Sequence, residues 1–361
     1  PASASNGDEI MFADYARNWG TNGIVIDSNG LNYQTQADTF DVGYGTDGTA
    51  LHIVYSGSTN GWIPTLDKAV TSAPFKRNSE GIFGYGLADA GLVSMTNLVS
   101  NGGVIAADVT GVGTARYGSA ACGYGYDKGI FGYGYTASYV SMTNLVSNAG
   151  VVTSDVTGVG TARKYSTACE YGGDKGIFGF GDTGSYVSMS NLVSNAGVAA
   201  TDTTGIGTGR SLAAACKYGD DKGIFGYGWT GSAVSMTNLV SNAGVIATDV
   251  TGVGTARMGL AACEYGDGKG IFGYGYDGSS VVSMTNLVSN TGVVTSDVTG
   301  VGTARNYLAA CEYGDDKGIF GYGKTASYVS MSNLVSNGGV IAADVTGVGT
   351  DRGYLGACSF N

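Results

Sequence analysis

Residues with chemically reactive side chains are few in this chain of 361 residues, and most of them recur at a fixed spacing. The only histidine, His52, lies in the alternating segment TALHIVYS, where we expect a structural or exposed role. The cysteines fall 47 or 48 residues apart in the same Ala-Cys context. This spacing predicts one reduced, buried thiol per repeated unit rather than a disulfide framework or a metal site. These cysteines are Cys122, Cys169, Cys216, Cys263, Cys311 and Cys358.

Recurring acidic and glycine-rich motifs favour turns over catalysis. One carboxylate per unit could be imagined as a calcium ligand, but the dense Asp/Asn alternation of a calcium loop is absent. These carboxylates are Asp108, Asp155, Asp202, Asp249, Asp297 and Asp344. The segment TGVGTAR lacks the Lys-Ser/Thr ending of a phosphate-binding loop. Asp182 and Asp277 are the acids that stand out in variable segments, and they lie two units apart. We therefore expect no catalytic residue, no metal and no cofactor.

Two positions in each unit are not copied although the surrounding sequence is nearly constant. One follows each GYG or GFG triplet, and the other follows the Arg of each TAR or its equivalent. Aromatic and charged residues gather there, and such residues make binding anchors, including flat surfaces for stacking on sugar rings. Free drift of exposed positions is the alternative interpretation. The candidate ligand-binding residues are Tyr135, Asp182, Trp229, Tyr276, Lys324, Tyr117 and Lys164.

Composition limits the class of protein. The net charge is −11, and the charges are spread along the chain, which argues against binding to nucleic acid. With 43% hydrophobic and 13% charged residues, the chain has enough apolar material for a large core. No apolar run approaches the length of a membrane span, so we expect no membrane insertion. The 64 glycines, spaced between β-branched and aromatic residues, predict an all-β fold with short strands and tight turns.

Six units of 47 or 48 residues follow one another from Gly81 onward. Each contains four strand-like segments, typified by YLAACEY, GIFGYG, SMTNLVS and GVVTSDV, and four antiparallel strands make one propeller blade. The array begins at a GIFGYG segment and ends after the segment that normally precedes it. Pairing Tyr354–Ser359 with Gly81–Gly86 would close a ring and remove two exposed sheet edges. In this topology both uncopied positions lie on one face of the ring.

The organisation of the chain follows from where the repeat begins. Residues 76–361 are predicted to form a six-bladed β-propeller closed by the C-terminal strand. Residues 1–75 do not repeat, and alternating strands with Asn-Gly and Ser-Gly turns predict a small antiparallel β module. Ser72–Ser79, with a proline and two positive charges, is interpreted as the linker.

The repeat resembles the Kelch family in its order of Arg, small-residue strand, turn and IFGYG strand, with Gly-Tyr-Gly in place of a glycine doublet. Residues 1–75 resemble a module of bacteriophage, including cyanophage, tail-fibre and virion proteins, through PASASNGDEIMFAD, NGIVI and the HIVYSGSTNGW segment. In that module the first of these segments is internal, so we expect Pro1 to begin within the domain.

The resemblance implies a virion protein, a fibre or a head or tail appendage, located on the particle surface and assembled in the host cytoplasm. Its partners would be other virion proteins through the N-terminal module and a host-surface glycan or protein through the propeller, in a homo-oligomer. A purely structural decoration protein is the first alternative. A glycan-cleaving enzyme is the second.

Overall fold

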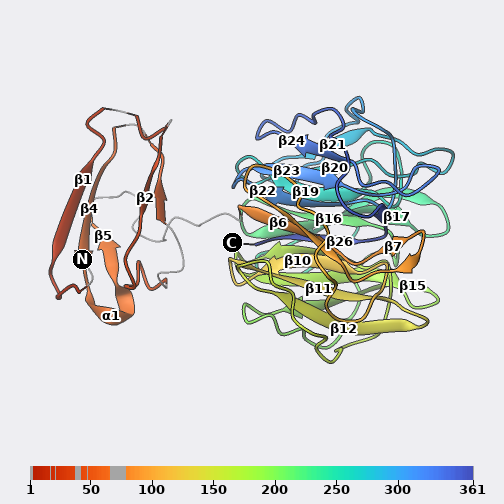
Figure 1. The fold of residues 1–361 in the computed structure, drawn as a ribbon, viewed down its shortest axis with the longest axis horizontal. Helices are drawn as coiled ribbons and strands as arrows, with labels where there is room; N and C mark the ends of the chain where they lie inside the picture. Colours follow the sequence, from red (N-terminus) through yellow and green to blue (C-terminus); the bar gives the residue numbers. More distant parts are fainter. Residues whose placement is uncertain are drawn as a thin grey trace. The chain divides into compact units, whose positions relative to one another are not determined.

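The computed structural model describes residues 3–16, 18–20, 22–36, 42–46, 48–65 and 79–360. The chain divides into two compact units, Pro1–Arg77 and Asn78–Asn361 (Figure 1). The structure is all-β, as the sequence predicts, and the one helix of the described residues is the short α1, Gly57–Asn60. No helix of these residues is long and apolar enough to cross a membrane. The linker predicted at Ser72–Ser79 lies outside the described residues except for Ser79.

Unit 1 is a small antiparallel β structure. One sheet has the order β1-β4-β5 and a second pairs β2 with β3. Tyr33, Leu51, Ile53 and Trp62 are almost fully buried in its core. His52 lies within 3.2 Å of the Glu9 carboxylate and 2.7 Å of the Thr65 hydroxyl. The strands are β1 (Glu9–Ala13), β2 (Ile24–Ile26), β3 (Val42–Tyr44), β4 (Ala50–Tyr55) and β5 (Trp62–Pro64).

Unit 2 repeats a three-stranded antiparallel sheet. Five of its sheets take three successive strands each, in the orders β10-β11-β12, β13-β14-β15, β16-β17-β18, β19-β20-β21 and β22-β23-β24. The first strands of these sheets are β10 (Ala120–Tyr124), β13 (Thr167–Tyr171), β16 (Ala214–Tyr218), β19 (Ala261–Tyr265) and β22 (Ala309–Tyr313). The middle strands are β11 (Lys128–Tyr135), β14 (Lys175–Asp182), β17 (Lys222–Trp229), β20 (Lys269–Gly273) and β23 (Lys317–Gly321). The third strands are β12 (Tyr139–Val146), β15 (Tyr186–Val193), β18 (Ala233–Val240), β21 (Thr285–Val288) and β24 (Ser332–Val335).

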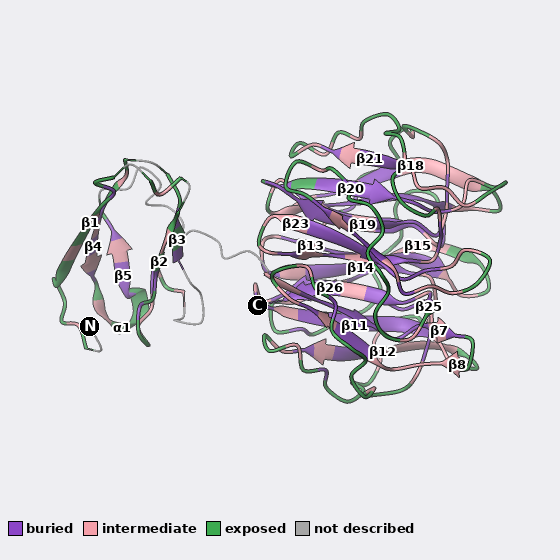
Figure 2. Ribbon diagram, turned by 45° about the horizontal axis from the view of Figure 1, so that its top comes forward, coloured by how far each residue is buried: buried purple, intermediate pink, exposed green. Residues whose placement is uncertain are grey.

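A further sheet joins the two ends of unit 2. The C-terminal strand β26 (Gly356–Phe360) pairs with β6 (Glu80–Gly84), which pairs in turn with β9 (Thr96–Val99). This is the pairing that the phase of the repeat predicts. The small sheet β25 (Arg352–Gly353), β7 (Leu87–Ala88) and β8 (Gly91–Leu92) extends it. In Figure 2, β25, β7 and β8 lie at the end of unit 2 away from the C-terminus.

The fourth predicted strand of each unit is only partly formed. The GVVTSDV-type segment contacts the third strand through two isolated bridges, as at Val146–Val152 and Thr143–Val156. Between these bridges, the Asn144 side-chain amide donates to the Thr153 carbonyl and to the Asp155 carboxylate. Because this side chain takes up a carbonyl of the segment, the backbone ladder is interrupted there. Each unit is therefore a three-stranded sheet with an attached edge segment.

Neighbouring sheets are joined through their first strands. β10 contacts β13, and the series continues through β16, β19 and β22 to β26, which contacts β10. Six backbone hydrogen bonds follow the same cycle just before these strands. In order, Gly118 N–H donates to Tyr354 O, Tyr165 to Gly118, Leu212 to Tyr165, Gly259 to Leu212, Tyr307 to Gly259, and Tyr354 to Tyr307. We call these six residues the collar.

The core of unit 2 lies between adjacent sheets (Figure 2). At one such junction the fully buried Tyr133 ring meets Phe178 edge to face at 5.2 Å, and the Arg163 guanidinium stacks over it at 4.0 Å. Gly132 faces the Phe178 ring so closely that an added Cβ would lie 2.7 Å from Cζ. The glycines of GIFG thus admit side chains of the neighbouring sheet, a use beyond turn formation.

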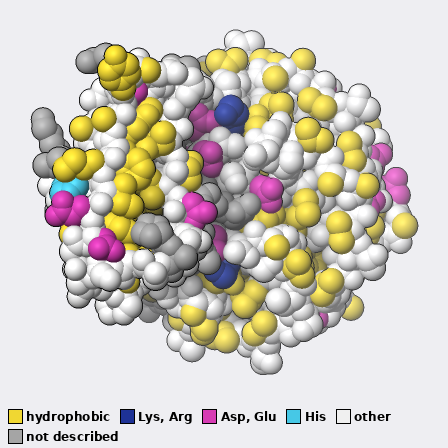
Figure 3. Space-filling view, turned by 60° about the vertical axis from the view of Figure 1, so that its left-hand side comes forward, with side chains coloured by type: hydrophobic (Ala, Val, Ile, Leu, Met, Phe, Trp, Pro, Cys, Tyr) yellow, Lys and Arg dark blue, Asp and Glu magenta, His cyan; other side chains and the backbone are white. Residues whose placement is uncertain are grey.

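Uncharged surface predominates on unit 2. Figure 3 shows hydrophobic side chains dispersed over it with few charged groups among them. One valine in each unit, directly after the turn that follows the third strand, is more than half exposed. These residues are Val104, Val151, Val198, Val245, Val293 and Val340.

Candidate functional site

The two uncopied positions of each unit pair with one another. Antiparallel bridges join Tyr117 to Tyr135, Lys164 to Asp182, Ser211 to Trp229, Met258 to Tyr276, and Asn306 to Lys324, and β25 pairs Gly353 with Leu87. We call these six couples the variable pairs. The sequence places their members in two connections on one face. In the structure each member has a defined pairing partner, and most are half-buried, while Ser211, Asn306 and Gly353 are buried. Diversity is therefore held on a rigid frame rather than on long loops.

Tyrosine rings cluster on one side of this face. Tyr117 contacts Tyr135, Tyr165 and Tyr354 with centroid separations of 5.6 to 5.8 Å, and Tyr354 stacks on Tyr307 at 3.9 Å. Tyr139 contacts Tyr135 at 5.3 Å. The Tyr328 ring lies against the backbone of Gly353, where an added Cβ would approach it to 3.1 Å. We call the set the tyrosine arc: Tyr117, Tyr135, Tyr139, Tyr165, Tyr307, Tyr328 and Tyr354.

A lysine lies at each end of the tyrosine arc. Lys164 Nζ is 4.9 Å from the centroid of Tyr135 and 5.0 Å from that of Tyr165, and 4.0 Å from the Asp182 carboxylate. Lys324 Nζ lies 5.3 Å from the centroid of Tyr328. Within the described part of the chain, no carboxylate lies within 4.0 Å of Lys324 Nζ. The arc therefore combines flat apolar surfaces with hydrogen-bonding hydroxyls and positive charge.

Burial raises the pKa of three tyrosines of the arc, Tyr165, Tyr328 and Tyr354. Burial raises the pKa of Tyr165, and the nearby Tyr117 hydroxyl raises it further. Burial likewise raises the pKa of Tyr354, with a second contribution from Tyr307. Burial also raises the pKa of Tyr328. The hydroxyls of these three residues can therefore both donate and accept hydrogen bonds.

The predicted site residues divide between two sides of the face. Tyr117, Tyr135 and Lys164 lie in or against the tyrosine arc, and Lys324 lies at its end. Trp229 and Tyr276 come from the two sheets outside it. Tyr276 donates its hydroxyl to the Gly278 carbonyl within its own turn. Sequence reasoning missed Tyr139, Tyr165, Tyr307, Tyr328 and Tyr354. For three of these a signal exists, because the collar position is also uncopied between units.

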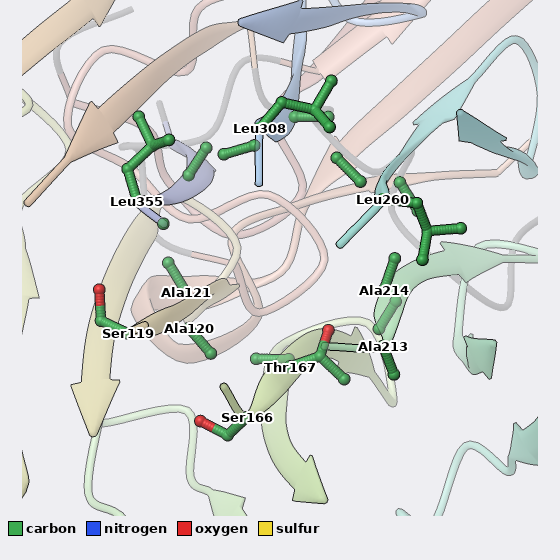
Figure 4. A pocket seen from close by; sticks show the side chains of 18 residues that line it. Ser119, Ala120, Ala121, Ser166, Thr167, Ala213, Ala214, Leu260, Leu308 and Leu355 are labelled. Carbon is green, nitrogen blue, oxygen red and sulfur yellow. The ribbon is translucent and has the colours of Figure 1, made fainter. Parts of the chain in front are cut away.

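A narrow cavity lies behind the collar and runs along the first strands of the sheets. Its outer part, about 70 Å³, is lined by the collar and by the residue after each collar position. Its middle part, about 100 Å³, continues past the following alanines. Figure 4 shows the shared lining residues arranged around it. They are Ser119, Ser166, Ala213, Leu260, Leu308 and Leu355, one from each unit.

Charged residues gather where the cavity reaches the other end of the first strands. Lys217 Nζ lies 3.3 Å from the Glu170 carboxylate and 3.0 Å from that of Glu264. Burial opposes the charge on Lys217, but Glu170, Glu264 and Glu312 outweigh it and raise the pKa of this amine. Burial raises the pKa of Glu312. The position occupied by these residues, after each Ala-Cys, is a third uncopied position that the sequence analysis passed over.

The recurring aspartates are engaged within the protein. Asp155 accepts hydrogen bonds from the Thr114 hydroxyl at 2.6 Å and from the Asn144 amide at 2.9 Å, and Arg116 lies 3.8 Å away. The same set recurs in the other units, as at Asp202 with Thr161, Asn191 and Arg163. The described residues contain no group of three or more His, Cys, Asp or Glu side chains that could hold a metal ion. Each of these carboxylates links two neighbouring units, because it accepts a hydrogen bond from the Thr of one unit and another from the Asn of the next.

The described residues form an all-β protein with repeated three-stranded antiparallel sheets, and the tyrosine arc lies on the face formed by the variable pairs. No family model matches the chain, and the search of curated proteins finds no match.

Proposed function

We propose that residues 79–360 form a closed six-bladed β-propeller of Kelch-like design. Three observations support this proposal. The pairing of β26 with β6 joins the two ends of the array. The collar links six successive units and returns to the first. A second cycle joins the last glycine of each Gly-Tyr-Gly or Gly-Phe-Gly triplet to the Arg carbonyl of the next unit, from Gly86 N–H to Arg116 O through to Gly323 N–H to Arg352 O.

The function that we propose is binding of a glycan at the face formed by the variable pairs. The tyrosine arc carries this proposal. Its rings present flat apolar surfaces with few rotamers to freeze, and its hydroxyls can bond to sugar hydroxyls. The rings belong to four neighbouring sheets, so a ligand meets an asymmetric surface rather than six equal sites. Low affinity at each site would be offset by avidity if several copies are displayed together.

We further propose that this binding serves a bacteriophage virion, in which the protein is a fibre or a head or tail appendage facing the host. The resemblance of residues 1–75 to phage virion modules supports this role. Unit 1 would attach to other virion proteins. It offers exposed apolar side chains for such contacts, including Met11, Tyr15 and Val25, and Figure 3 shows hydrophobic side chains gathered on it.

The proposal is tested by measuring binding of the full chain to an array of purified bacterial capsular and lipopolysaccharide glycans. The variant Tyr117→Ala/Tyr135→Ala is expected to lose about tenfold or more in affinity for the glycan that binds, since two stacking surfaces are removed. The variant Trp229→Ala/Tyr276→Ala is expected to lose less, because these residues lie outside the tyrosine arc. Val198→Ala, on a turn after a third strand, is the control and should bind as the wild type does.

The outcomes separate the alternatives. Absence of binding to every glycan, with unchanged melting temperature for all variants, would favour a structural decoration protein. Binding that survives both double substitutions would place the site elsewhere. Release of reducing sugars from a bound polysaccharide would reveal a glycan-cleaving enzyme. The two acids that stand out in the variable segments both have partners within the protein. Asp182 pairs with Lys164, and Asp277 accepts hydrogen bonds from the backbone N–H groups of Ser279 and Ser280 in its own turn.

A further inference from the structure

The ammonium group of Lys164 lies among four tyrosine rings of the arc. Its Nζ is 4.9 Å from the centroid of Tyr135 and 5.0 Å from that of Tyr165. The centroids of Tyr139 and Tyr117 follow at 5.6 and 5.9 Å. The Lys164 side chain is 18% exposed. Because ring faces attract a cation, these tyrosines hold a positive charge at a fixed place on the variable face.

The hydrogen-bond donors of this ammonium group are not taken up by the protein. The Asp182 carboxylate lies 4.0 Å from Lys164 Nζ, which is too long for a hydrogen bond, and no described residue accepts one from this atom. Asp182 instead accepts a hydrogen bond from the Gly184 N–H at 2.7 Å. An ammonium group carries three donors. Those of Lys164 are therefore left for solvent or a ligand.

The other end of the tyrosine arc carries a second lysine of this kind. Lys324 Nζ lies 5.3 Å from the centroid of Tyr328. In the part of the chain that the structure describes, this atom has neither a carboxylate within 4.0 Å nor a hydrogen-bond acceptor. Tyr354 is near both ends, because its ring is 5.7 Å from that of Tyr165 and Tyr328 is close enough to help raise its pKa. One continuous aromatic surface thus connects the two positive charges.

Most other lysines of unit 2 are held by acidic neighbours. Lys217 pairs with two glutamates. Four lysines lie 2.5 to 2.7 Å from the aspartate that precedes each of them, namely Lys128, Lys175, Lys222 and Lys317. The chain as a whole has a net charge of −11. Lysines without a hydrogen-bond acceptor are therefore uncommon in this protein, and two of them border the tyrosine arc.

We infer that the glycan bound at the tyrosine arc is acidic, with one anionic group bound by Lys164 and a second by Lys324. Each group accepts hydrogen bonds from the ammonium, while the sugar that carries it stacks on a neighbouring tyrosine ring. A carboxylate, as in a uronic acid, and a phosphate group share this chemistry. Asp182 balances the charge of Lys164 in the free protein and opposes the binding of an anion. This inference rests on the proposed glycan-binding function and adds the charge class of the ligand.

The repeat supplies substitutions that remove these charges and are compatible with the fold. The position of Lys164 is occupied by Met258 in another unit, and the position of Lys324 is occupied by Leu87. Lys164→Met keeps a long flexible side chain whose sulfur can still contact the tyrosine rings. Lys324→Leu likewise places at this position a residue that the repeat already accommodates.

Two further variants complete the set. Asp182→Asn removes the opposing charge, and its side-chain oxygen can still accept the Gly184 N–H. Lys222→Met is the control, because Lys222 pairs with Asp221 at the turn before a middle strand and belongs to no variable pair. It removes one positive charge from the protein, as Lys164→Met does, but away from the tyrosine arc.

Binding of each full-length variant is measured on the same array of capsular and lipopolysaccharide glycans. Each glycan is presented in its native form, after carbodiimide-activated borohydride reduction of its carboxyl groups to alcohols, and after removal of phosphate with hydrofluoric acid. The wild type should bind acidic glycans and lose about tenfold or more in affinity when the responsible group is removed. Loss on carboxyl reduction assigns a carboxylate, and loss on the acid treatment assigns a phosphate.

The variants should separate charge from packing. Lys164→Met should lose about tenfold in affinity for the native glycan but bind the neutralised form as the wild type does. Lys324→Leu should behave in the same way with a loss of about threefold or more. Asp182→Asn should bind the native glycan about two- to fivefold more tightly, since a repelling charge is removed. Lys222→Met should match the wild type on both forms.

Several results decide against the inference. Equal binding of native and neutralised glycans by the wild type would overturn it while leaving glycan binding in place. Full binding of the native glycan by both Lys164→Met and Lys324→Leu would show that neither ammonium contacts the ligand. Equal losses of Lys164→Met on the native and neutralised forms would mean that this lysine only holds the rings in position. Binding to no glycan on the array would remove the proposed function and the inference together.

Discussion

The middle residue of each Gly-Tyr-Gly or Gly-Phe-Gly triplet adopts a backbone conformation that is rare for residues other than glycine. Tyr133 has φ 63° and Phe180 has φ 59°, and the strand pairing shifts register at this point. The bulge turns the aromatic ring into the junction, where it lies between a phenylalanine and an arginine of the next unit. The strain is sustained because burial and hydrogen bonding fix the residue on all sides.

Glycines at the start of the middle strands are packing sites, and this predicts their sensitivity to substitution. In Gly176→Ala the new Cβ would lie 2.6 Å from Cys122 Sγ and 3.1 Å from the Gly123 carbonyl. We expect a loss of about 1–3 kcal/mol in the free energy of unfolding, measured in urea. Gly102→Ala is the matched control, because its nearest neighbour is 3.7 Å away and other units carry alanine there. Equal stability of the two variants would contradict this packing.

The six cysteines should be unreactive in the native protein. All are free and buried. Burial raises the pKa of Cys122 and of its equivalents, which disfavours the nucleophilic thiolate. A thiol reagent should count six groups in denaturant and react far more slowly without it. Fewer than six in denaturant would mean that some are bridged, and rapid native reaction would mean that the first strands open readily.

At the scale of the element, the sequence predicts three of the four strands of each unit. It also predicts the pairing of the C-terminal strand with the first strand of the array. It does not predict the interruption of the fourth, because that depends on an Asn side chain from the third strand meeting a carbonyl nine residues away. The variable pairs could be placed on one face by topology. The tyrosine arc could not, since it depends on how the rings of Tyr165, Tyr307 and Tyr354 pack against one another across units.

The Asp-Thr-Asn-Arg contacts that join the units predict acid sensitivity. Burial works to raise the pKa of Asp155, but hydrogen bonds from Thr114 and Asn144 outweigh it and hold the pKa below its usual 3.8. The same holds for the other five aspartates, such as Asp202 and Asp344. A lowered native pKa adds stability above the ordinary value, and this stability is lost as the pH falls through the native value.

We therefore expect the free energy of unfolding to fall steeply below about pH 4. Glu312, whose pKa is raised, acts in the opposite direction and gains stability on protonation, but it is one group against six. Urea unfolding between pH 7 and pH 3 measures the effect, and Asp202→Asn should make the curve shallower. A flat curve for the wild type would show that these carboxylates are not preferentially ionised in the native state.

At the scale of the whole molecule, the C-terminal strand determines the integrity of unit 2. Removal of Gly353–Asn361 deletes β26 together with the buried Leu355 and Phe360, and it removes Tyr354 from the collar. Loss of these two side chains alone costs several kcal/mol, so the melting temperature should fall by roughly 10 °C or more. Calorimetry of the truncated and full-length chains tests this. Equal melting temperatures would mean that the sheets are stable without the link.

The collar has a consequence for how this protein can change. Its six hydrogen bonds use only backbone atoms, and the residues that make them are as different as glycine, leucine and tyrosine. The collar hydrogen bonds therefore do not depend on which side chains the collar residues carry. A gene conversion that moves one unit into the place of another, or a few point mutations at the variable pairs, would produce a new face on an unchanged scaffold. If the face binds a glycan as proposed, recombination among the copies would change its specificity without changing the fold.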